Sequence, residues 1–118
     1  MNNSDFIKLA KKKQMQTNEP VRLGISIHKV IHRWNGNDTR YFRLYLDDVE
    51  VTKNVAEILN YPLSKSSSSK LHGCVLVHGS NMDMAFALCN SFRAKTLHEY
   101  GDLFDNDYAY RGFNSWTK

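Results

Sequence analysis

The sequence predicts an α+β fold in which an antiparallel sheet of three or four strands packs against two or three helices. Residues 21–51 alternate between apolar and polar side chains in three segments separated by turn residues, which is typical of a β-meander. Apolar residues with helical spacing occur before and after this meander. The chain has 118 residues, of which 42% are apolar and 24% charged, so we expect one globular domain over residues 1–118.

The chain begins with a short amphipathic helix over residues 4–15. Ser4 is a suitable N-cap, and Asp5 lies where the helix dipole favours a negative charge. The apolar side chains of this helix, which should be buried, are Phe6, Ile7, Leu9, Ala10 and Met15. Residues 16–20 should form a linker to the sheet.

The meander consists of strands over 21–34, 39–46 and 49–51. Residues 35–38 contain Asn-Gly, the strongest short signal for a hairpin turn, and 47–48 form a second tight turn. The alternation slips at 29–31, which predicts a bulge or a strong twist there. We expect the core-facing residues to be Val21, Leu23, Ile25, Ile27, Phe42, Leu44 and Leu46.

The second half of the chain contains weaker signals. Residues 53–60 predict a helix that Thr52 caps and Pro62 ends. The remaining segments are a mobile polar surface loop over 64–70, a fourth strand over 71–77, a helix over 81–98 that Gly101 ends, and an aromatic, acidic tail over 102–118. Because exposed aromatic residues are unfavourable in water, this tail should pack on the body of the protein or on a partner.

Positive charge is concentrated in the first third of the chain. The net charge is +4. Residues 1–40 contain eight Lys and Arg against three acids, whereas residues 41–118 contain eight against nine. A basic segment is compatible with nucleic-acid binding, since neutralising phosphates releases counterions. It is equally typical of a solvated helix face, and a charge of this size favours the second interpretation.

The predicted hairpin offers one candidate binding surface. Its outward residues include Arg40, Tyr41, Arg43 and Tyr45, and alternating Arg and Tyr would suit phosphate contact and base stacking. The simpler interpretation is the solvated face of a half-buried sheet, where Tyr and Arg are common.

A second candidate site is the turn before the last helix. His78, Gly79, Ser80, Asn81 and Asp83 lie at a strand end that leads into a helix, where free N–H groups attract anions such as those of a nucleotide. The negative charge of Asp83 would repel a phosphate, so a turn capped by its own side chains is the stronger interpretation.

The sequence contains no convincing catalytic or metal-binding set. His72, Cys74, His78 and Cys89 lack the spacing of a zinc site, and no nucleophile elbow, Rossmann or P-loop pattern is present. Two cysteines are too few for a disulfide framework. We therefore expect no catalytic residues, no metal and no cofactor, and we expect that the chain is not an enzyme.

The segment His78–Phe86 resembles a hallmark of small, functionally uncharacterised proteins encoded by bacteriophages and prophages. Met82, Asp83, Met84 and Phe86 match that hallmark, Gly-Gly-Cys-Gly-Met-Asp-Met-Gly-Phe, whereas its cysteine is replaced by Ser80. The hairpin segment Arg33–Arg40 keeps only the turn character and the arginine of the group. The resemblance implies a phage origin but no particular activity.

From these features we expect a phage-encoded accessory protein that binds and inhibits a host protein. The target would be a host factor, such as a defence component that an anti-CRISPR-like or other counter-defence protein blocks. The expected location is the cytoplasm of an infected bacterium, without membrane association. The alternatives are a small nucleic-acid-binding protein and a binder of nucleotides or other small ligands at residues 79–83. The sequence does not fix the oligomeric state and is compatible with a dimer.

Overall fold

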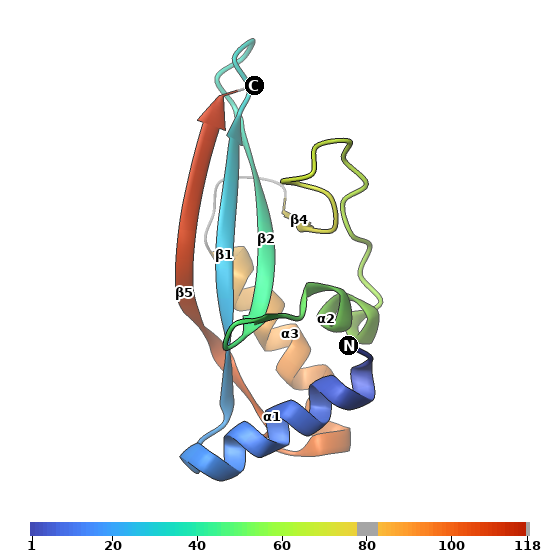
Figure 1. Ribbon diagram of the computed structural model, residues 1–118. Helices are drawn as coiled ribbons and strands as arrows, with labels where there is room; N and C mark the ends of the chain where they lie inside the picture. Colours follow the sequence, from blue (N-terminus) through green and yellow to red (C-terminus); the bar gives the residue numbers. More distant parts are fainter. Residues whose placement is uncertain (78–82, 118) are drawn as a thin grey trace.

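The computed structural model describes residues 1–77 and 83–117 and confirms the predicted α+β class (Figure 1). The elements are α1 (Asn3–Thr17), β1 (Val21–Ile31), β2 (Asp38–Leu46), β3 (Val49–Glu50), α2 (Thr52–Leu59), β4 (Val75–Val77), α3 (Asp83–Tyr100) and β5 (Phe104–Thr117). The molecule is elongated, with extents of 49 × 24 × 23 Å. Among the described helices, none has both the length and the apolar character required to cross a membrane.

The strands form one mixed sheet in the order β3-β2-β1-β5. The pairs β1–β2 and β2–β3 are antiparallel, as the meander predicts. The short strand β4 also pairs with β2, beside Arg40–Phe42, while β3 pairs beside Tyr45 and Leu46. One long edge of the sheet is therefore occupied by two short strands, and the opposite edge is β5.

The residues expected to form a C-terminal tail instead form β5, which pairs with β1 in parallel. The register shifts twice, between Val21 and Leu23 and between Ile25 and Ser26 of β1. The irregularity predicted at residues 29–31 is absent from the β1–β2 ladder, which is continuous from Gly24 to Ile31. The prediction placed the break wrongly because the partner that causes it, β5, was not recognised as a strand.

The sheet has a core face and an open face. Ile25, Ile27, Phe42 and Leu44 are at most 1% exposed, which confirms the predicted core-facing set. Because side chains alternate along a strand and direct cross-strand neighbours share a face, Ser26, His28, Tyr41 and Arg43 lie together on the opposite, open face. Figure 1 shows α3 behind the sheet, while the β1–β2 hairpin extends beyond all three helices.

Three aromatic rings connect the helices to the sheet. Phe6 of α1, Phe92 of α3 and Phe104 of β5 are at most 1% exposed. Their ring centroids lie 6.1 Å (Phe6–Phe92), 5.5 Å (Phe6–Phe104) and 4.7 Å (Phe92–Phe104) apart, distances at which aromatic rings attract one another. This cluster closes one end of the core.

The helix ends agree in part with the predictions. The N-cap of α1 is Asn2 rather than Ser4, because the Asn2 side chain accepts a hydrogen bond from the N–H of Asp5 at 2.7 Å. Thr52 is the first residue of α2, and its hydroxyl accepts from the N–H of Leu44 at 2.9 Å. Gly101 ends α3 with a positive φ of 68°, as expected of a C-cap glycine.

Candidate functional site

The open face is bordered by an irregular segment that we call the strap, residues 60–74 between α2 and β4. Ser64 donates its N–H to the carbonyl of Cys74 at 2.8 Å, and Gly73 donates to the carbonyl of Ser64 at 2.9 Å. Leu63 also forms an isolated bridge with Val75. The polar run within it, predicted as a mobile loop, is thus closed at its base by hydrogen bonds between the two ends of the strap.

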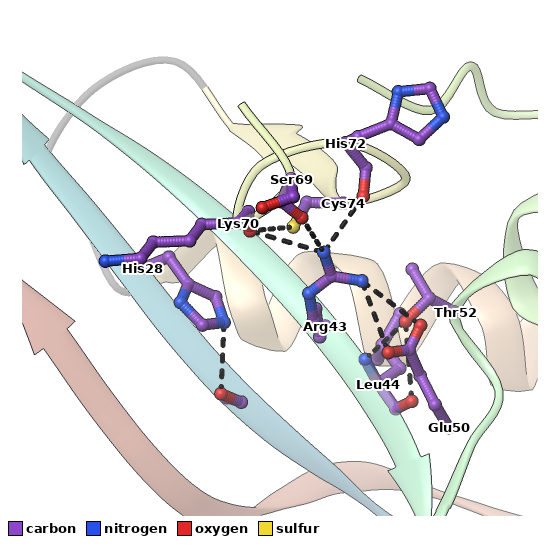
Figure 2. Close-up of polar contacts among 10 residues, drawn as sticks. His28, Arg43, Leu44, Glu50, Thr52, Ser69, Lys70, His72 and Cys74 are labelled. Carbon is purple, nitrogen blue, oxygen red and sulfur yellow. Dashed lines mark hydrogen bonds and ion pairs between the residues drawn. The ribbon is translucent and has the colours of Figure 1, made fainter. Parts of the chain in front are cut away.

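Arg43 holds the middle of the strap to the open face (Figure 2). Its terminal nitrogen Nη1 lies 3.2 and 3.3 Å from the two carboxylate oxygens of Glu50. Nη2 donates to the backbone carbonyls of Lys70 at 3.2 Å and His72 at 2.9 Å. Only 16% of the Arg43 side chain is exposed. Both terminal nitrogens are therefore engaged within the chain and not directed towards a ligand.

His28 lies beside this ion pair on the open face. Its Nε2 is 3.3 Å from the hydroxyl of Ser26, and its ring meets the ring of Trp116 edge-on at 6.3 Å between centroids. Burial lowers the pKa of His28 below its ordinary value of 6.5, and the positive charge of Arg43 adds to this effect. At neutral pH the His28 ring is therefore uncharged.

We expect NMR to report a His28 pKa below 6.5 in the folded protein. Since the unfolded chain then binds the proton more readily, protonation favours unfolding. The contribution of His28 to stability is fully present above pH 6.5 and is lost as the pH falls through the folded-state pKa. Titration of the His28 ring protons, compared with unfolding midpoints of the His28→Gln variant at several pH values, checks this. A folded-state pKa at or above 6.5 would contradict it.

Tyr45 is covered by an arginine from β5. The guanidinium carbon of Arg111 lies 4.4 Å from the centroid of the Tyr45 ring, a cation–π contact. Arg111 also donates to the backbone carbonyl of Asp47 and lies 3.5 Å from the carboxylate of Asp48. The stem of Arg111 crosses Gly24, where an added Cβ would lie 2.6 Å from the Arg111 Cδ. This arrangement leaves the Tyr45 ring poorly placed to stack on a base.

The structure therefore does not bring the four predicted hairpin residues together as one free surface. Arg40 lies directly opposite Lys29 and so on the other face of the sheet from Tyr41. Arg43 and Tyr45 are engaged by Glu50 and Arg111, respectively. Tyr41 keeps the predicted outward position and is half-buried.

The second predicted site, the turn before α3, lies largely outside the described residues. The residues outside are His78, Gly79, Ser80 and Asn81. Asp83 is the first residue of α3. The candidate anion site thus remains a prediction.

Neither metal-binding nor reactive thiol chemistry is indicated in the part of the chain that the structure describes. Within residues 1–77 and 83–117, no group of three His, Cys, Asp or Glu side chains is arranged to hold a metal ion. Cys74 and Cys89 are free thiols and buried. Burial raises the pKa of Cys89 to about 12, and Asp107 and Asp105 add to this effect, so its reactive thiolate form is rare at neutral pH.

The tip of the β1–β2 hairpin carries the most exposed aromatic side chain of the described residues. Trp34 is 82% exposed, and Arg33 beside it is exposed as well. Figure 1 shows this tip at the far end of the molecule from α1. The sequence analysis predicts a turn at residues 35–38 but does not identify Trp34 as exposed. A tryptophan next to a turn between two strands was the signal for an exposed aromatic tip.

The tip has a defined conformation. His32 donates its N–H to the carbonyl of Asn37 at 2.7 Å, and its ring Nε2 lies 2.9 Å from the Thr39 hydroxyl. Gly36 has a φ of 73°, a backbone conformation that glycine adopts without a steric penalty. Lys29 and Asp38 form an ion pair at 3.1 Å at the base of the turn. These contacts hold the turn that carries Trp34 in one conformation.

Comparisons of the chain with protein-family models, with curated proteins and with solved structures found no match.

Proposed function

We propose that this chain is a phage-encoded accessory protein without catalytic activity that binds and inhibits a host protein, with Trp34 as the centre of the contact. The observation that carries this proposal is an 82% exposed tryptophan at the end of a projecting, braced hairpin. The phage origin rests on the Met-Asp-Met resemblance. The host target would be met in the cytoplasm of an infected bacterium.

Burying Trp34 in a partner would release a large free energy. A tryptophan side chain buries about 150–250 Å², and at about 25 cal/mol per Å² this gives roughly 4–6 kcal/mol on complete transfer from water. Tryptophan and arginine are enriched among the residues that dominate protein–protein binding energy. Because the turn is already hydrogen-bonded, little further ordering is needed on binding.

The chemistry of the tip also describes its partner. Arg33 directly precedes Trp34 at the tip and carries a positive charge, and both residues are exposed. We therefore expect the host protein to offer an apolar pocket with acidic groups at its rim. The attraction between Arg33 and these acidic groups would speed up association, and added salt would weaken this attraction.

The nucleic-acid alternative draws less support from the open face. Arg43 and Arg111 are the arginines on this face that could contact phosphates. Arg43 already binds Glu50 and backbone carbonyls, and Arg111 already binds Asp48. A nucleic acid is therefore not the proposed partner, and the nuclease treatment in the experiment tests for one.

The test is affinity purification of the tagged chain from bacterial lysate with and without nuclease treatment, followed by binding and activity measurements with the purified candidate host protein. We expect Trp34→Ala to weaken binding at least about 30-fold, corresponding to about 2 kcal/mol, and to relieve inhibition in parallel. Met15→Ala is the matched control, because Met15 is 80% exposed on α1, away from the tip.

Three results would overturn the proposal. One is equal binding by the Trp34→Ala variant and the unmodified chain. Another is binding of a host protein with no effect on its activity. The third is a bound component that disappears on nuclease treatment, which would favour the nucleic-acid alternative instead.

A further inference from the structure

The strand β5 leaves one long edge of the sheet unpaired. It spans 14 residues and pairs with β1 along one side. Within the described ranges 1–77 and 83–117, no strand pairs with its other side. Figure 1 shows β5 at the outer margin of the sheet. Such an edge presents unpaired N–H and C=O groups and is a template for another strand.

Aromatic side chains accompany this edge. Tyr110 is 61% exposed and Phe113 is 44% exposed. Phe86 of α3, 48% exposed, meets the Tyr108 ring at 5.1 Å between centroids. A row of partly exposed aromatic residues along an unpaired strand is typical of a surface that another protein covers.

The register shift in β5 makes this edge self-complementary. Before the shift, Tyr108 and Tyr110 lie opposite Leu23 and Ile25; after it, Phe113 lies opposite Ile27. The alternation of faces is therefore displaced by one residue between the two halves of the strand. Arg111 and Gly112 both lie on the open face, because Arg111 covers Tyr45 and Gly112 lies opposite Ser26. When two such strands pair antiparallel, the faces therefore match along the strand only if the two-fold axis passes between Arg111 and Gly112, at the displacement itself.

We infer that two copies of this chain form a two-fold symmetric dimer by antiparallel pairing of their β5 strands about that axis. The arrangement places Ala109 opposite Asn114 of the second copy, and Tyr110 opposite Phe113 of the second copy. The two sheets then become one continuous sheet, and the interface is isologous and closed, so it cannot extend into a fibre. The inference concerns an edge distinct from the hairpin tip and does not depend on the proposed function.

Charge distribution favours this register over others. Asp105 and Asp107 lie in the first half of β5, where they form ion pairs with Arg22 at 3.6 and 4.0 Å. The axis between Arg111 and Gly112 keeps the acidic halves of the two copies apart. It brings Asp107 opposite Trp116 of the second copy, whose ring is contacted by a lysine, Lys70, at 5.2 Å. A parallel pairing would instead place the acidic halves side by side.

The same acids limit the length of the backbone ladder. The carboxylate of Asp105 accepts from the N–H of Asp107 at 3.1 Å, and that of Asp107 accepts from the N–H of Tyr108 at 2.8 Å. These groups are not available to a neighbouring strand. The hydrogen-bonded ladder is therefore centred on residues 109–114, and the flanking side chains complete the contact.

The dimer also determines how the hairpin tips of the two copies are oriented. Because the two β5 strands run in opposite directions, the Trp34 tips of the two copies point away from each other. A dimer would present two copies of the same contact at opposite ends of one particle.

Analytical ultracentrifugation of the full chain over a range of concentrations tests the assembly. We expect a species of twice the 13.7 kDa chain mass that dissociates on dilution. Phe113→Asp should weaken dimerisation at least about tenfold, because it replaces an aromatic contact with a carboxylate against the Tyr110 ring of the second copy. Met15→Asp, at an exposed position on α1, should leave it unchanged. A monomer at all concentrations would overturn the inference.

A disulfide test fixes the register. Directly opposed residues in an antiparallel pair lie about 4.5–5.5 Å apart at Cα, which suits a disulfide. Ala109 and Asn114 are both exposed, so both positions tolerate cysteine. We expect an oxidised mixture of Ala109→Cys and Asn114→Cys chains to yield mixed cross-linked dimers, and neither variant alone to cross-link comparably. Equal cross-linking of the single variants would overturn this register.

Discussion

Replacing Phe92 with alanine is expected to lower the free energy of unfolding by about 3–5 kcal/mol. Phe92 is 1% exposed and contacts both Phe6 and Phe104, so its removal leaves a cavity where α1, α3 and β5 meet. The loss combines the transfer free energy of a phenyl ring with the cost of that cavity. Because a domain of this size is stable by only about 5–15 kcal/mol, the variant should lie close to its unfolding threshold.

Urea denaturation followed by circular dichroism measures this effect, and Leu97→Ala is the matched control. Leu97 lies on the same helix but is 41% exposed, so its truncation should cost less than about 1 kcal/mol. Equal losses in the two variants would mean that the Phe6–Phe92–Phe104 cluster contributes no more to stability than an exposed position of the same helix.

The meander was predictable because its signal is local. Ile25, Ile27, Phe42 and Leu44 follow a simple alternation, and Asn-Gly marks the turn between them, so the face of each residue could be assigned without knowing its partner. The same applies to Gly101, whose position after an apolar helix is itself the signal. In these segments, local pattern and tertiary structure favour the same conformation.

The strand β5 could not be predicted in the same way. Its pairing with β1 is parallel and joins segments separated by most of the chain. The register shift beside Arg111 and Gly112 interrupts the alternation that would identify a strand. Asp105 and Asp107 add turn-like composition to its first half. The sequence therefore shows aromatic residues in need of burial but not the strand that carries them.

The candidate site shows the same division between local and long-range information. The outward position of Arg43 followed from alternation, but its partners follow from the strap, whose carbonyls reach it from residues 69–72. An arginine that appears available in the sequence is thereby committed to structure. Conversely, Trp34 was not singled out, because exposure of an aromatic residue depends on how far the hairpin projects beyond the helices.

Replacing Arg43 with alanine is expected to cost about 2 kcal/mol of stability and to release the strap from the sheet. The variant loses the Glu50 ion pair and the hydrogen bonds to the carbonyls of Lys70 and His72. Hydrogen bonds to a charged group contribute about 1.5–3 kcal/mol when buried, and the partial exposure of Glu50 reduces this total. Arg43→Lys should recover only part of the loss, because a single ammonium cannot contact both the Glu50 carboxylate and the strap carbonyls, as the planar guanidinium does.

Limited trypsin digestion separates release of the strap from global destabilisation. The carbonyl of Lys70 that accepts from Arg43 belongs to the peptide bond that trypsin cleaves, so its cleavage in Arg43→Ala should accelerate roughly tenfold for each 1.4 kcal/mol of local stability lost. Arg93→Ala is the matched control, since Arg93 also pairs with an acid, Asp102 at 2.8 Å, but on an exposed surface. That variant should be cleaved after Lys70 at the unmodified rate, because the exposed pair contributes little and lies outside the strap. Unchanged cleavage in Arg43→Ala would show that the strap is held by its end contacts alone.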